Sequence, residues 1–137
     1  MRITSIITSI LLIQGSSAFA CGHCIEDKIA SVYDYAIVSK AVSEKHIVVF
    51  FSIEGPLVAN ADSKQKIKSI VEKMNGVDPK SIKLSMDTAS LSVAFDPARI
   101  SYAVLLDSLE KKLVSKKLSL YPLDTVTQMP KFKVASK

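Results

Sequence analysis

The chain has 137 residues, 18 of them Lys or Arg and 13 Asp or Glu, so its formal net charge is +5 at neutral pH. This length suits one domain with one modest hydrophobic core. The basic residues are mostly lysines spread along predicted helices, and no Arg-rich or aromatic-interleaved stretch is present, which argues against nucleic acid as a partner. Paired carboxylates, a Ser–His–Asp set and a phosphate-binding glycine loop are also missing, so hydrolase and kinase chemistry have no support.

Residues 1–20 have the composition of a secretory signal peptide. A short basic start is followed by an apolar run at 6–13 and by Ala18-Phe19-Ala20, a sequence typical of a cleavage site. The apolar run is too short to cross a bilayer, so we expect no transmembrane segment after the leader is removed. Lipidation of Cys21 is the alternative, because this cysteine directly follows the cleavage site. We expect a periplasmic or secreted protein in an oxidising compartment.

The only two cysteines, Cys21 and Cys24, are separated by two residues, Gly22 and His23. From Cys24 to about residue 42, apolar residues recur every three to four positions, which predicts one amphipathic helix. Acidic residues in its first turn favour the positive end of the helix dipole. The same dipole is expected to lower the pKa of a thiol at this position. Segment 21–45 is therefore interpreted as a helix that presents thiols at its start.

The rest of the chain alternates strand patterns with helix patterns. The expected strands are 46–53, 82–86, 91–95 and 117–123, and the expected helices are 63–74 and 101–114. This order is that of a ferredoxin-like βαββαβ unit, with one antiparallel sheet and its helices on one face. The predicted fold is therefore α+β, with a ferredoxin-like sandwich over 46–123 and an extra helix in front of it. The weakly patterned tail, 124–137, is expected to be loose.

The second half of this unit carries a sequence pattern of its own. Its residues include Gly76-Val77-Asp78-Pro79, Ile82-Lys83-Leu84 and Leu91-Ser92-Val93-Ala94-Phe95-Asp96-Pro97. They resemble the second half of heavy-metal-associated (HMA) domains, the small modules of copper chaperones and transport ATPases, whereas 46–75 matches that family only in element order. The family's Cys-x-x-Cys follows the first strand, but the matching loop here, 54–62, has no cysteine. The motif at 21–24 resembles the family's motif moved to the mature N-terminus.

The resemblance implies a metal carrier and not an enzyme. Soft thiolates select Cu(I), so Cys21 and Cys24 are the expected ligands, with His23 as an auxiliary ligand and zinc as the alternative ion. If Cys21 is the new N-terminus, its amine and His23 could also wrap Cu(II) or Ni(II) in a square plane. The expected function is an exported copper-binding protein or metallochaperone. Its expected partners are a metal ion and a copper transporter or cuproprotein, and a homodimer sharing four thiolates is also open.

Two other functions use the same cysteines. Cys-Gly-His-Cys is the active-site tetrapeptide of thioredoxin-like disulfide isomerases, so a periplasmic thiol–disulfide oxidoreductase is the first alternative. The thioredoxin fold is not carried over, because no strand precedes the motif and the chain has no Trp. The second alternative is an interaction module with an inert 21–24 disulfide, although so short a loop adds little stability. We expect His46, Met74 and Met86 to be structural and Met129 not to bind metal.

Overall fold

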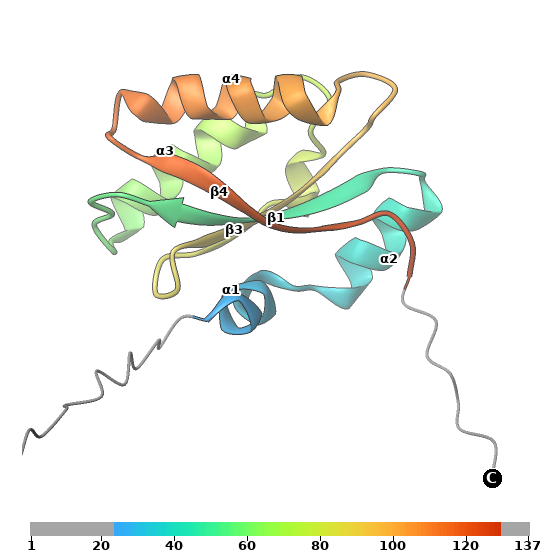
Figure 1. Cartoon of the computed structure of the whole chain (residues 1–137), viewed down its shortest axis with the longest axis horizontal. Coiled ribbons are helices and arrows are strands. Elements are labelled where there is room, and N and C mark those ends of the chain that lie inside the picture. The colour runs from blue at the N-terminus through green and yellow to red at the C-terminus, as the bar shows by residue number, and fades with distance from the viewer. Residues whose placement is uncertain (1–23, 130–137) are drawn as a thin grey trace, which may run out of the picture.

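The computed structural model describes residues 24–129, which form an α+β protein with four α-helices and a four-stranded antiparallel sheet (Figure 1). The predicted α+β class and the alternation of strands and helices are confirmed. The elements are α1 Ile25–Val32, α2 Tyr35–Ser43, β1 Ile47–Glu54, α3 Ala61–Glu72, the 3-10 turn η1 Pro79–Ser81, β2 Lys83–Ser85, β3 Ser90–Phe95, α4 Tyr102–Val114 and β4 Ser119–Val126. The predicted leader and the end of the tail lie outside the described residues.

The strands are ordered β2-β3-β1-β4, and every neighbouring pair is antiparallel. The central strand β1 is buried from Val48 to Ile53, as its nearly continuous apolar sequence predicted. The prediction of a loose tail from residue 124 is wrong for its first three residues. Asp124, Thr125 and Val126 belong to β4, because the first half of β1 binds them through a register that shifts at a bulge.

The sheet is covered on both faces (Figure 1). Helices α3 and α4 lie on one face, as expected for the helices of a βαββαβ unit, and α1 and α2 lie on the other. Successive residues of β1 alternate between the two cores: Val49 and Phe51 belong to the larger one and Val48 and Phe50 to the smaller one. The larger core has sixteen buried apolar residues and the smaller one six. The N-terminal helices therefore add a second, thinner layer to the sheet.

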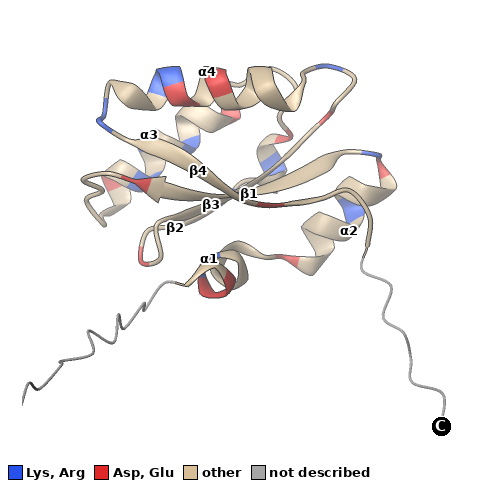
Figure 2. Ribbon diagram, in the orientation of Figure 1, with Lys and Arg blue, Asp and Glu red and all other residues tan. Residues whose placement is uncertain are grey.

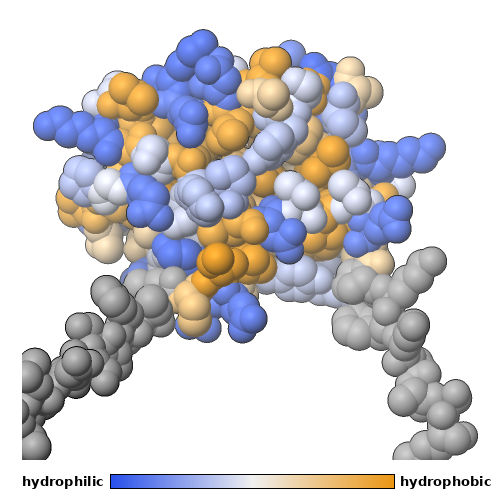
Figure 3. Space-filling view, in the orientation of Figure 1, coloured by the Kyte–Doolittle hydropathy of each residue, from blue (hydrophilic) through white to orange (hydrophobic). Residues whose placement is uncertain are grey.

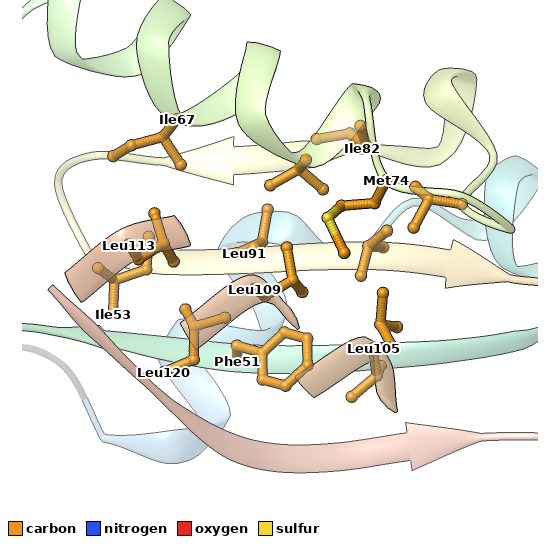
Figure 4. Close-up of a cluster of buried hydrophobic side chains, with 14 of the residues drawn as sticks. Phe51, Ile53, Ile67, Met74, Ile82, Leu91, Leu105, Leu109, Leu113 and Leu120 are labelled. Atoms are coloured by element: carbon orange, nitrogen blue, oxygen red, sulfur yellow. The ribbon is translucent and has the colours of Figure 1, made fainter. Parts of the chain in front are cut away.

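The larger core lies between the sheet and the pair α3 and α4 (Figure 4). Helix α4 contributes Leu105, Leu109 and Leu113, whose spacing of four residues puts them on one face against Phe51. Met74 is only 7% exposed and belongs to this core, so its predicted packing role is confirmed. Apolar periodicity therefore identified most of the inward positions, but it also predicted Val104 to be inward, and Val104 is 54% exposed.

Residue type at the helix starts predicts Ser101 as the cap of α4 and Asp62 or Ser63 as the cap of α3, and the structure agrees with the first prediction only. The Ser101 hydroxyl accepts the backbone N–H of Val104 at 3.3 Å, which confirms Ser101 as the cap of α4. The cap of α3 is Asn60, whose side-chain oxygen accepts the N–H of Ser63 at 2.7 Å, and not Asp62 or Ser63 as predicted. Asn60 is the cap because it directly precedes the first helical residue, Ala61, and its extended backbone directs the side chain toward the free N–H groups of the first turn.

The single N-terminal helix predicted from Cys24 to about residue 42 is wrong, since the segment forms two helices. The chain is extended at Tyr33 and Asp34, and the Asp34 carboxylate accepts the backbone N–H of Ile37 at 3.2 Å. This capping bond begins α2 and competes with continuation of α1. The break also turns the Tyr33 ring onto Phe50, with ring centroids 6.2 Å apart and planes at 20°. The break thus lets two short helices both pack against this face of the sheet.

Residues of both charge signs occur in the helices and in the loops (Figure 2). On the face drawn in Figure 3, apolar and hydrophilic side chains both reach the surface. The exposed apolar residues include Tyr35, at 64%, and Tyr121 of β4, at 62%. Among residues 24–129, no helix is long and apolar enough to cross a membrane.

Candidate functional site

The structure describes one of the three predicted metal ligands. Cys24 is the N-cap residue of α1, and its side chain is exposed. Cys21 and His23 lie outside the described residues, so their geometry about Cys24 stays a prediction. A thiol in this position is accessible to solvent, to a metal ion and to a partner protein.

The nearest polar neighbour of Cys24 is Asp27, one turn into α1. The Cys24 Sγ donates a hydrogen bond to Asp27 Oδ2 at 3.1 Å. The bond to this carboxylate, together with partial desolvation and the repulsion between the two negative charges, raises the pKa of the Cys24 thiol above its usual value. The prediction that the helix N-terminus lowers this pKa is therefore wrong, because an adjacent carboxylate outweighs the backbone N–H groups. The i, i+3 spacing of the two residues was the sequence signal for this contact.

Helix α1 is attached to the turn between β2 and β3 by polar contacts. The Lys28 ammonium donates to the carbonyl of Thr88 at 2.8 Å and, at 3.4 Å, to that of Ala89. The hydroxyls of Ser31, Thr88 and Ser90 form a closed triangle with sides of 2.6, 2.9 and 2.6 Å. Each hydroxyl bonds to both of the others, and the Ser31 hydroxyl also donates to the Lys28 carbonyl at 2.8 Å, so the polar groups between helix and turn are satisfied. Sequence reasoning missed these residues, because nothing local in the chain relates 28–31 to 88–90.

These contacts place α1 at one end of the sheet. The backbone N–H of Ile53, near the end of β1, donates to the Ala89 carbonyl at 2.8 Å. Residue 53 is followed within two positions by the connection that leads to α3. The residues that anchor α1 thus lie at the same end of the sheet as the β1–α3 connection, and Cys24 precedes Lys28 by one helical turn.

The other residues considered as ligands lie apart from Cys24 in the chain and have structural contacts. His46 stands before β1, with its side chain 21% exposed and its Nδ1 3.6 Å from the Glu44 carboxylate. Met86 is half-buried in the connection between β2 and β3. Met129 packs, partly buried, against the smaller core. Within residues 24–129, no three His, Cys, Asp or Glu side chains are grouped so that they could hold a metal ion.

No family model matches the chain, and no curated protein is significantly similar to it. The resemblance to HMA domains therefore depends on the residues quoted above and on the arrangement of the strands and helices.

Proposed function

We propose that this protein is an exported copper carrier or metallochaperone that holds Cu(I) between Cys21 and Cys24, with His23 as an auxiliary ligand. The observation that carries the proposal is the exposed thiol of Cys24 at the start of a helix that is fastened to the sheet. A carrier must accept and release its ion, so an exposed thiol at a helix end suits this role better than a buried thiol. The donor chemistry fits, because soft sulfur prefers Cu(I) to harder ions.

The fold adds a second line of support. We propose that β1 to β4 with α3 and α4 form a ferredoxin-like unit. The strand order β2-β3-β1-β4 and the position of both helices on one face agree with this. In HMA domains, which the sequence resembles, the metal-binding loop follows the first strand. Here the helix that begins at Cys24 is anchored at the corresponding end of the sheet, through the Ile53–Ala89 bond and the contacts of Lys28.

The alternative role of thiol–disulfide oxidoreductase is less well supported. The attacking thiol of such an enzyme works as a thiolate and usually has a lowered pKa. Asp27 acts in the opposite direction on Cys24. A smaller fraction of the Cys24 thiol is therefore thiolate at neutral pH, which disfavours Cys24 as the attacking thiol. For metal binding a raised pKa is no obstacle, since the ion displaces the proton, but binding should then tighten as the pH rises.

The proposal is tested by anaerobic titration of the reduced protein with Cu(I) against a competing chelator. Intact-mass measurement of the same sample identifies the N-terminus and any lipid. The parent should compete with the chelator, and both Cys21→Ser and Cys24→Ser should lose this ability. Met129→Leu is the matched control, because it removes a sulfur without removing a proposed ligand and should leave the titration unchanged. Equal titration curves for the parent and both serine variants would refute the metal-binding proposal.

A further variant separates copper from zinc. Asp27→Asn removes the carboxylate that accepts the thiol proton. If Cu(I) is the cargo, the variant should bind it at least as tightly as the parent, because thiolate formation becomes easier. A zinc site would favour the carboxylate as an oxygen ligand and should weaken in the same variant. A thiol reduction potential near those of oxidising isomerases, together with no Cu(I) binding, would instead support the redox role.

A further inference from the structure

A groove runs between α3 and the C-terminal end of α4, on the face of the sheet opposite α1. It consists of three adjoining hollows of about 200, 250 and 470 Å³, and Lys116 lines all three. The other lysines that line them are Lys66, Lys73, Lys111 and Lys112. This surface, the lysine groove, is lined by no Asp or Glu within the part of the chain that the structure describes. It therefore concentrates positive charge in a concave part of the surface.

The positive charge of the lysine groove is only partly neutralised. Lys66 is paired with Asp62 at 2.6 Å and Lys111 with Asp107 at 2.7 Å. Lys73, Lys112 and Lys116 are exposed and make no ion pair with any of residues 24–129. Lysines in the last turn of α4 favour the negative end of its dipole, which accounts for Lys111 and Lys112. The dipole of α3 likewise favours Lys73 at its C-cap, but it does not account for Lys66 in the middle of that helix.

The floor of the lysine groove is apolar. Ile70 of α3 lines two of the hollows and is half-buried. Leu57 and Leu118 line the hollow next to the β1–α3 connection, where Val58 is 61% exposed. Ser69 and Ser115 line the largest of the three hollows together with Ile70 and the lysines. A ligand that fits the groove should therefore carry negative charge along its edges and apolar groups toward its middle.

We propose that the lysine groove binds an acidic, extended segment of a partner protein. An extended peptide points successive side chains to opposite sides, so acidic residues can reach the lysines of the rim while the alternate apolar residues enter the floor. A membrane surface fits less well, because a bilayer is flat and cannot follow hollows with an apolar floor between helices. This surface lies on the other face of the sheet from α1, the helix that Cys24 caps, and does not depend on the proposed binding of copper.

The test uses the purified chain without added metal and a fluorescent peptide of alternating glutamate and leucine. Its fluorescence anisotropy should rise on binding and should fall as salt is added, because exposed charges are screened. The double variant K112E/K116E should weaken binding by roughly tenfold, since each exposed charge pair contributes modestly and two are reversed. The matched control is K64E/K80E, which changes the net charge equally at two exposed lysines that do not line the groove.

Each result either supports or overturns the proposal. Support requires that the parent and K64E/K80E bind alike, that K112E/K116E binds more weakly, and that amide shifts in NMR spectra include Ser69, Ile70 and Ser115. Equal weakening in both variants would mean that only the net charge matters, and would overturn it. So would equal binding of a peptide with glutamine in place of glutamate, no binding of the acidic peptide, or a preference for phosphatidylglycerol vesicles over the peptide. Thermal unfolding of both variants distinguishes lost binding from lost folding.

Discussion

The two cores should differ in how much of the fold depends on them. Two neighbouring phenylalanines of β1 allow a direct comparison. Phe50 is 1% exposed and belongs to the smaller core, and Phe51 is fully buried in the larger one. The variants Phe50→Ala and Phe51→Ala make the same chemical change at adjacent positions. We expect Phe50→Ala to release α1 and α2 while the rest of the fold persists, and Phe51→Ala to destabilise the whole protein.

The magnitudes follow from the sizes of the two cores. A buried Phe→Ala change costs about 3–5 kcal/mol, compared with a total stability of about 5–15 kcal/mol for a small domain. Phe50 is the only aromatic residue among the six buried residues of the smaller core, and its loss also removes the stacking of Tyr33. That stacking contributes about 0.5–1.5 kcal/mol. What still attaches α1 is the packing of Val32 and Ile29 in the smaller core and the polar seam at Lys28, and these contacts are too small to offset such a loss.

Hydrogen exchange under native conditions measures the outcome, because local opening and global unfolding protect different sets of amides. In Phe50→Ala, amides of residues 25–43 should exchange fast while those of α4 keep most of their protection. In Phe51→Ala, protection should fall in α3 and α4 as well. If Phe50→Ala lowers protection equally in all helices, the two layers unfold as one unit, and the reasoning from separate cores is refuted.

Three further predictions concern single residues. Asp27→Asn should lower the pKa of the Cys24 thiol, so that iodoacetamide alkylates it faster at a pH of about 8 in a variant without the other cysteine; an unchanged rate would contradict the role of the carboxylate. Gly76→Ala should lower the free energy of unfolding by at least about 1–2 kcal/mol and so lower the urea midpoint. The reason is that φ of Gly76 is +83° and the new Cβ would lie 2.5 Å from Ile100 Cγ2. An unchanged midpoint would contradict this. The backbone N–H of Ile37 and the Lys83 ammonium lower the pKa of the Asp34 carboxyl. The ionised carboxylate therefore stabilises the fold at pH values above the unfolded-state pKa of about 3.9. This contribution is lost as the pH falls through the pKa of the folded state. Amides of α2 should lose protection over that acidic range in the parent, and Asp34→Asn should show no such pH dependence.

Most of the element positions could be predicted from local pattern. The strand expected at 46–53 is β1, Ile47–Glu54, and the helix expected at 101–114 is α4, Tyr102–Val114. The break in the N-terminal helix could not be predicted from periodicity, because apolar residues continue at helical spacing across Tyr33 and Asp34. The cap at Asp34 and the stacking of Tyr33 on Phe50 decide it, and the second of these depends on a strand far along the chain.

The candidate site shows the same division. The sequence predicted that Cys24 stands at the start of a helix, and the structure confirms this position; its pairing with Cys21 around a soft metal ion stays a prediction. The effect of Asp27 on the Cys24 thiol was not evident, because sequence alone does not say whether a carboxylate one turn away will turn toward the sulfur or toward solvent. The side-chain geometry decided that, and it reversed the expected direction of the pKa shift.

The sequence by itself determined the α+β class, the order of strands and α-helices from β1 onward and most of the inward positions of α3 and α4, because hydrophobic periodicity records which side of each element is buried. Only the tertiary structure decided that the sheet is covered on both faces, that α1 is fastened to the β2–β3 turn and that the lysines of α3 and α4 line one groove. The physical reason is that these features arise between segments far apart in the chain. Their free energy depends on distances that no local pattern of residues contains.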